Sequence, residues 1–210
     1  MDRDLIDKFR GKANEHSYCQ RKYSCINGKN LWHCICSAMD WITVGVTNID
    51  FHPDLQLFGH NEEKTLGILM LLMQVAMIKE GIEQLHRVLA NTDGIYLNTD
   101  TSIWGDNPYF QTDNEYFETL RACFGAHPVN LKGFKGIENE KKRFASWPFV
   151  AINGFEVLLY PSTSTGCDLA LNISFDQLER YAIKRYCHLR DLISLIDTDM
   201  AEENLRGGKL

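Results

Sequence analysis

With 210 residues, of which 44% are hydrophobic and 11% aromatic, the chain can bury a sizeable core, which excludes a disordered protein. Its formal net charge of -6 excludes a surface coated in nucleic-acid-binding positive charge, although a local basic site is compatible with it. Seven cysteines, an odd number, and a charged N-terminus unlike a secretory leader predict reduced thiols and a cytoplasmic protein.

Helices are expected to dominate the first ninety residues. Residues 2–25 predict one or two short helices. Asn30 is placed to cap a helix over about 31–48, and Asn61 to cap the longest helix, over about 62–90. Apolar residues recur at helical spacing in both long segments, so each is expected to contribute one face to a shared core.

No segment is expected to cross a membrane. The most apolar run, residues 66–78, follows Glu62 and Glu63 and precedes Lys79 and Glu80. It is shorter than the roughly 20 apolar residues that a spanning helix needs. We therefore expect a buried helix of a soluble protein.

The segment after Thr112 predicts a short helix, over about 113–127, with clear ends. Thr112 caps its N-terminus, and Glu115 completes a capping box. Pro128 disfavours helical geometry at His127, so this imidazole is expected where the helix stops. Arg121 lies among aromatic residues on the same helix.

From residue 149 the pattern changes to strands. Residues 149–152, Asn153-Gly154 and residues 155–160 predict a β-hairpin with a type I′ turn, and residues 169–173 a third strand. A second capping box, Ser174 with Gln177, opens a final helix that is expected to run to about Ile196.

These elements predict a mainly α fold. We expect a bundle of about five helices with a small antiparallel β-hairpin or three-stranded element inserted before the last helix. We expect one domain, residues 1–210, with the β insertion at about residues 149–173.

Arg121 and His127 are the candidate catalytic residues. A guanidinium offers five donors in a fixed fork that suits a phosphate, and an imidazole exchanges protons near neutral pH. In a straight α-helix, residues six apart are about 120° apart around the axis. The two side chains therefore meet only if the helix terminus unwinds or a second subunit brings them together.

The pattern Arg121-x5-His127, at the end of a bundle helix, resembles the R-x(4–6)-H motif of the HEPN superfamily (higher eukaryotes and prokaryotes nucleotide-binding). The resemblance implies a bundle of four to five helices, usually a homodimer with the motifs of two protomers facing each other across a cleft. Many members are metal-independent ribonucleases of toxin–antitoxin, phage-defence and RNA-processing systems. The resemblance covers the motif helix and the bundle layout, not the β element, and Ala122 stands where the family often has a polar residue.

On this resemblance, Arg121 holds the scissile phosphate. His127 serves as general base or acid while a ribose 2′-OH attacks the phosphorus, which leaves a 2′,3′-cyclic phosphate. The expected protein is cytoplasmic and binds RNA or cleaves it as a metal-independent endoribonuclease, with no metal or cofactor. RNA, a second copy of the chain and a protein partner such as an antitoxin are the expected partners.

A purely structural interpretation stands beside this one. Arg121 would then pair with an acid such as Asp40 or Glu118, and His127 would cap carbonyls at the helix end. A second pair with the same spacing, Arg10 and His16, shows that the motif also arises by chance. The densest basic run follows His127 and is either a solvated linker or a phosphate-binding patch: Lys132, Lys135, Lys141, Lys142 and Arg143.

Two alternative functions remain open at this point. The first is a non-catalytic module that binds a protein partner or its own copy through exposed aromatic residues, Trp104, Tyr109 and Phe110. The second is a small-ligand-binding protein with a pocket between the bundle and the hairpin, lined by Trp147 and Tyr160.

Two other groups of side chains bear on metal binding. His33, Cys34 and Cys36 lie in a predicted helix, which points the two thiols roughly 200° apart, so buried free cysteines are favoured over a zinc site. One loop collects four residues that could ligate a metal or carry acid–base chemistry: Asp50, His52, Asp54 and His60.

Overall fold

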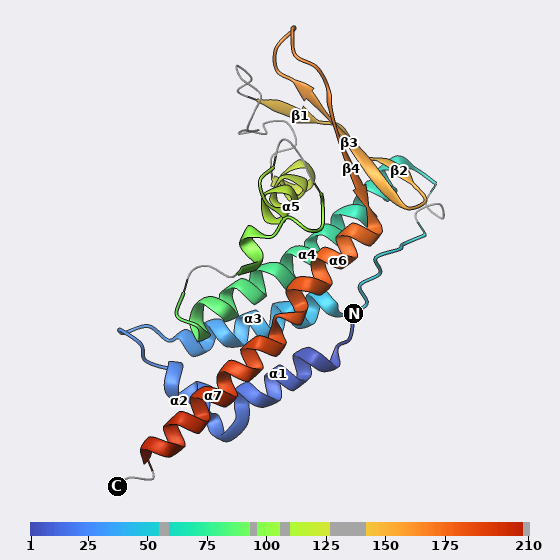
Figure 1. Ribbon diagram of the computed structural model, residues 1–210. Coiled ribbons are helices and arrows are strands. Elements are labelled where there is room, and N and C mark those ends of the chain that lie inside the picture. Colours follow the sequence, from blue (N-terminus) through green and yellow to red (C-terminus); the bar gives the residue numbers. More distant parts are fainter. Residues whose placement is uncertain (55–58, 93–95, 106–109, 127–141, 208–210) are drawn as a thin grey trace. The chain divides into compact units, whose positions relative to one another are not determined.

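The computed structural model describes residues 1–54, 59–92, 96–105, 110–126 and 142–207 (Figure 1). The chain divides into two compact units. Unit 1 comprises Met1–Ile49, Gln74–Ile95 and Ala182–Leu210, and unit 2 comprises Asp50–Met73 and Tyr96–Tyr181. Both units contain segments distant in sequence, and the prediction of one domain over residues 1–210 stays a prediction.

Unit 1 is built from helices (Figure 1). The predicted short helices at the N-terminus are confirmed as α1 (Asp4–Asn14) and α2 (Tyr18–Tyr23), joined by a 3-10 turn. The next two are confirmed as α3 (Leu31–Val46) and α4 (Asn61–Leu89), of which the C-terminal part belongs to unit 1. Asn30 caps α3 as predicted, because its side chain accepts a hydrogen bond from the His33 N–H at 3.2 Å.

The core of unit 1 is a single apolar cluster to which α1, α2, α3, α4 and the C-terminal helix contribute. Two glycines allow α3 and α4 to approach closely. A Cβ atom at Gly45 would lie 2.8 Å from Ile78 Cγ1, and one at Gly81 would lie 2.5 Å from Ile42 Cγ1. Larger residues at these positions would force the two helices apart, because packed interiors leave little free volume.

The predicted final helix is two helices, α6 (Phe175–Cys187) and α7 (Leu189–Gly207), separated by a turn at His188. The predicted end near Ile196 is wrong, since α7 continues to Gly207. Beyond Ile196 the helix is held by ion pairs within unit 1. Lys12 Nζ lies 2.7 Å from Asp197 Oδ1, and Lys22 Nζ lies 2.5 Å from Asp199 Oδ2.

Unit 2 contains the antiparallel sheet (Figure 1). The predicted hairpin and third strand are confirmed as β2 (Phe149–Ala151), β3 (Gly154–Pro161) and β4 (Leu169–Ser174). An additional short strand, β1 (Arg143–Ala145), also pairs with β3. β4 pairs along one edge of β3, while β1 and β2 follow one another along the other edge.

The edge formed by β1 and β2 is interrupted by a bulge. Ala145 pairs with Leu159 and Phe149 with Glu156, so the outer edge has one residue more than β3 between these pairs. Ser146 maintains the contact with β3 at this point. Its N–H donates to the Leu158 carbonyl at 2.8 Å, and its hydroxyl accepts from the Leu158 N–H at 3.1 Å.

The hairpin turn differs from the prediction. Ala151 pairs with Gly154, so the two turn residues are Ile152 and Asn153. Neither they nor Gly154 has a positive φ, which a type I′ turn requires at both central positions. Gly154 is needed for another reason, because a Cβ atom there would lie 2.0 Å from the carbonyl oxygen of Ile173 on β4.

The interior of unit 2 is rich in stacked aromatic rings. α5 (Asp113–Arg121) places Phe117 against Tyr181 of α6, with ring centroids 4.7 Å apart. Phe155 of β3 meets Phe124 at 5.6 Å and Phe175 at 5.9 Å. These contacts fix α5 to the sheet and to the start of α6. The predicted mainly α fold with an inserted antiparallel β element is confirmed.

α4 is the one helix of the described chain whose length and composition would suffice to cross a membrane. Its most apolar 18-residue window has a mean hydropathy of 1.6, and half of that window is buried inside the protein. The apolar stretch of this helix is therefore longer than residues 66–78 suggested. A buried core helix has the same properties, so α4 alone is weak evidence of a membrane protein.

Candidate functional site

The start of α5 is capped much as its sequence predicts. The Thr112 hydroxyl accepts from the Glu115 N–H at 3.1 Å, which satisfies one of the unpaired donors at a helix N-terminus. The Glu115 carboxylate reaches back as in a capping box, but it accepts from the Gln111 N–H, at 2.8 Å. The beginning of the motif helix is thus fixed by two side chains.

A buried aspartate ties this helix to the preceding loop. Asp113 is 1% exposed, and its carboxylate accepts from the N–H groups of Ile103 and Trp104, each at 3.1 Å. The Trp104 indole N–H donates to the Asp113 carbonyl at 3.0 Å, and the indole stacks on Tyr116. Sequence patterns gave no sign of this arrangement, since an aspartate in a first helical turn is usually solvated.

Arg121, the first predicted site residue, is the last residue of α5. Its side chain is 40% exposed, although Phe117 one turn earlier is fully buried. Its Nε and Nη2 both donate to Glu118 Oε2, at 3.1 Å and 2.9 Å. Glu118 was one of the two acids expected as a structural partner, and this ion pair holds the guanidinium at the protein surface.

The chain leaves α-helical geometry directly after Arg121. Ala122–Ala126 form a π turn, so the straight α-helix that the sequence predicted ends at Arg121. Cys123 in this turn is buried, and its burial raises the pKa of the thiol to about 12. His127, the second predicted site residue, and Pro128 lie outside the described residues.

Only the end of the predicted basic run belongs to the described chain. Lys142 is exposed, whereas Arg143 is 4% exposed. Arg143 Nη1 donates to the carbonyl oxygens of Leu159, at 2.9 Å, and Cys167, at 3.1 Å. Arg143 therefore connects β1 to β3 and to the loop before β4. Its buried side chain is not placed to bind a phosphate. Lys132, Lys135 and Lys141 lie outside the described residues.

The second pair with the same spacing is a useful contrast. Arg10 donates to Asp40 at 3.1 Å and to Thr43 at 3.2 Å, and so joins α1 to α3. The His16 side chain is 80% exposed and lies in a 3-10 turn. The two residues serve different local purposes, which supports the interpretation that this copy of the motif is a coincidence.

The aromatic residues of the two alternative functions have different environments. Trp104 and Phe110 both pack on a tyrosine of α5 and form no exposed patch, and Tyr109 lies outside the described residues. Trp147 and Tyr160 are 57% and 40% exposed. Neither lines the pocket of about 500 Å³ that β2, β3, β4 and the start of α6 form.

The seven cysteines are free, and Cys34 and Cys36 lie in α3 as predicted. Cys34 Sγ lies 3.7 Å from an Arg87 guanidinium nitrogen and 4.0 Å from Gln84 Oε1. Burial raises the pKa of the Cys36 thiol. The two thiols have separate surroundings, which agrees with the preference for free cysteines over a shared zinc ion.

His52 has partners that the sequence pattern missed. Its Nε2 lies 3.3 Å from Glu179 Oε2 and 3.5 Å from Asp176 Oδ1, both on α6. Asp50, one of the loop residues that could ligate a metal or carry acid–base chemistry, accepts a hydrogen bond from the His52 backbone N–H at 2.9 Å. We call His52, Asp176 and Glu179 the His52 cluster. The spacing of Asp176 and Glu179 on one helix face was the available signal.

A group of hydrogen-bonded polar side chains around the buried His188 in unit 1 was also not predicted. His188, 4% exposed, lies 2.9 Å from Asp191 through Nδ1 and 3.0 Å from His86 Nδ1 through Nε2. A hydrogen bond between two imidazole nitrogens needs one donor and one acceptor, so one proton is shared at this contact. These hydrogen bonds join the last turn of α4 to the start of α7 and fix the turn between α6 and α7.

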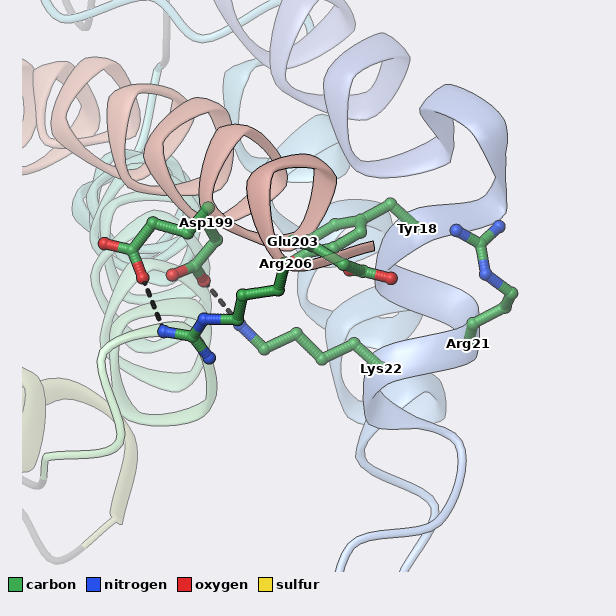
Figure 2. A pocket seen from close by; sticks show the side chains of 7 residues that line it. Tyr18, Arg21, Lys22, Asp199, Glu203 and Arg206 are labelled. Carbon is green, nitrogen blue, oxygen red and sulfur yellow. Dashed lines mark hydrogen bonds and ion pairs between the residues drawn. The ribbon is translucent and has the colours of Figure 1, made fainter. Parts of the chain in front are cut away.

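Unit 1 also has a charged pocket of about 360 Å³ between α2 and α7 (Figure 2). Three basic side chains, three acidic ones and a tyrosine line it: Tyr18, Arg21, Lys22, Asp199, Glu202, Glu203 and Arg206. Burial alone would lower the pKa of Lys22, but hydrogen bonds to Asp199 and Tyr18 outweigh it and raise the pKa. Because acids match the bases in number, this pocket has little net charge with which to attract a phosphate.

Protein families, curated proteins and solved structures were each compared with the chain, and none of them matches it.

Proposed function

We propose that this chain is a HEPN-like protein that binds RNA and cleaves it as a metal-independent endoribonuclease through Arg121 and His127. The carrying observation is the position of Arg121. Its guanidinium is held at the surface by Glu118, at the point where α5 gives way to a π turn. π turns inside helices occur frequently at functional sites.

The chemistry assigned to each residue follows from its side chain. Arg121 would bind the scissile phosphate and stabilise the charge that develops on it, since a guanidinium pairs well with phosphate oxygens. His127 would accept or donate the proton while the 2′-OH attacks. Glu118 would orient the guanidinium, and it would also compete with the phosphate for it.

The test is an RNA-cleavage assay in the presence of EDTA with four alanine variants. We expect Arg121→Ala and His127→Ala each to lose at least about a hundredfold in cleavage rate, the usual range for removing a proton-transfer group or a charge-stabilising donor. The products should carry 2′,3′-cyclic phosphates. Arg10→Ala and His16→Ala are matched controls with the same spacing and should cleave like the unaltered protein.

A binding measurement separates RNA binding from cleavage. RNA with a 2′-deoxy substitution at the cleaved nucleotide cannot be cut by 2′-OH attack, so its affinity for each variant can be measured directly. Arg121→Ala should weaken binding about tenfold, whereas His127→Ala should not. Equal cleavage by the Arg121 and Arg10 variants, or no interaction of the unaltered chain with RNA, would refute the proposal.

A second candidate, a protein-interaction module, is favoured by one observation. Large hydrophobic side chains are exposed near the edge that β1 and β2 form: Trp147 at 57%, Phe149 at 50% and Ile152 at 84%. Clustered exposed aromatic and aliphatic residues often mark binding surfaces. A Trp147→Ser, Phe149→Ser double variant that still cleaves RNA but no longer binds a protein partner would assign this edge to recognition.

A further inference from the structure

We propose that the His52 cluster binds one divalent transition-metal ion of the zinc class. The ligands would be His52 Nε2 and one carboxylate oxygen each from Asp176 and Glu179. These three atoms already lie within 4.8 Å of one another, from two segments distant in the sequence. The site is independent of Arg121 and His127, so its test and the ribonuclease assay can fail separately.

The distances favour a metal over a simple ion pair. A charge-assisted N–H···O hydrogen bond is about 2.7–2.9 Å long. His52 Nε2 is farther than that from both carboxylates, at 3.3 Å and 3.5 Å. Ligand atoms about 2.0–2.1 Å from a tetrahedral zinc ion are about 3.3–3.4 Å apart, which is close to these two separations, and the two carboxylate oxygens lie within 4.8 Å of each other.

The number of acceptors points the same way. Both carboxylates converge on one ring nitrogen, which carries at most one proton and donates one strong hydrogen bond. The imidazole therefore cannot donate a strong hydrogen bond to the second carboxylate. A cation between the three atoms would bind the nitrogen lone pair and both oxygens at once.

The cluster is preorganised from both sides. Asp176 and Glu179 are three residues apart on α6, so their side chains lie on one face of the helix. The His52 backbone is held by Asp50, and its ring meets the buried Phe175 ring edge-on at 6.4 Å. All of these residues belong to unit 2. The metal would therefore stabilise the segment around His52 against the start of α6.

The ligand set indicates the class of ion. One imidazole with two carboxylates suits zinc, cobalt or manganese better than magnesium or calcium, which prefer oxygen ligands. Three protein ligands leave a position for water or another ligand. The side chains of His52, Asp176 and Glu179 are 55%, 76% and 36% exposed, so the ion can enter from solvent.

The test uses the full chain with its accessible thiols blocked, because exposed free cysteines also bind zinc. Isothermal titration with ZnCl₂ should show one site per chain, and zinc in excess should raise the Tm by at least about 4 °C. Binding of Co²⁺ gives a second readout through its absorption spectrum. His52→Ala, Asp176→Asn and Glu179→Gln should each weaken binding at least about tenfold.

His16→Ala is the matched control. His16 also lies near a carboxylate, Glu15, at 3.9 Å, but has no second one beside it in the described chain. This variant should bind zinc like the unaltered protein. Zinc binding that is unchanged in His52→Ala, or no binding by the unaltered chain, would overturn the proposal and leave an ion pair only.

Discussion

The two units of this chain are stabilised by different kinds of contact. Unit 1 has a mainly aliphatic core that helices with regular apolar spacing cover, and its buried polar residues Lys79 and His188 bind other side chains. Unit 2 relies on stacked aromatic rings and on buried polar side chains, Asp113 and Arg143, that bind backbone groups of loops and of β3. The candidate chemistry, Arg121 and the His52 cluster, lies in unit 2. Both candidate sites thus lie in the unit whose buried polar side chains bind the backbone.

A buried cysteine in each unit allows this comparison to be tested by thiol labelling. Burial raises the pKa of Cys19, in unit 1, to about 11 and that of Cys123, in unit 2, to about 12. At pH 8 the thiolate fraction of both should be reduced roughly a hundred- to thousandfold relative to an ordinary cysteine. Cys25 and Cys167 are exposed and should react at once.

The measurement is the labelling rate of single-cysteine variants in increasing urea. If Cys19 and Cys123 become reactive over the same urea range, the units unfold together as one domain. If Cys123 becomes reactive first, unit 2 opens separately. A Cys19 that reacts as fast as Cys25 in the native protein would contradict the packing of α2.

Gly154→Ala should be the most destabilising small substitution in unit 2. The added Cβ would lie 2.0 Å from a backbone oxygen on β4, which cannot rotate away as a side chain can. We expect a loss of about 3 kcal/mol in the free energy of unfolding, measured by urea denaturation. Gly11→Ala is the control, because no atom lies within 4 Å of its Cβ position in α1, and it should stabilise by about 0.5–1 kcal/mol.

The surface ion pairs of unit 1 should have the smallest effect. Lys22→Met should lower the free energy of unfolding by at most about 1 kcal/mol at pH 7, since the pair with Asp199 is partly exposed. The folded protein raises the pKa of Lys22 above its ordinary value of 10.5. Its contribution is therefore complete below pH 10.5 and is lost as the pH rises through the folded-state pKa.

Urea denaturation at pH 7, 9 and 11 checks this dependence. The free energy of unfolding of Lys22→Met should fall below that of the unaltered protein by the same amount at pH 7 and pH 9. At pH 11 this difference should begin to shrink. Lys8→Met changes an exposed lysine of α1 and should have little effect at any pH. If the loss of stability in Lys22→Met grew as the pH rises, the predicted direction of the pH dependence would be wrong.

The elements that sequence patterns predict well are those with an apolar period and a local stop or start signal. α3 begins after the Asn30 cap as expected, and β4 forms where the apolar pattern of residues 169–173 predicts a strand. The end of α7 was missed because ion pairs to α1 and α2, not an apolar stripe, hold its second half. β1 was missed because Arg143 belongs to a basic run that resembles a linker.

The candidate site is predictable only as far as its contacts are local. The Thr112 cap and the Glu118 partner of Arg121 lie within three residues of their targets and follow from helix geometry. The partners of His52 are up to 127 residues away, and no local pattern indicates which of many acids will meet it. The π turn after Arg121 likewise has no sequence signal that we recognise.

The bulge between β1 and β2 also bears on how the protein behaves at high concentration. Among the described strands none pairs with the outer side of β1 and β2. Such an edge is a template for another chain, and the exposed Trp147 and Phe149 would favour such contact. Pro148 has no N–H to offer, and the extra residue shifts the register between the two short strands. A strand from another molecule therefore cannot pair in one continuous register with both β1 and β2. This break in register protects the edge from β-sheet aggregation.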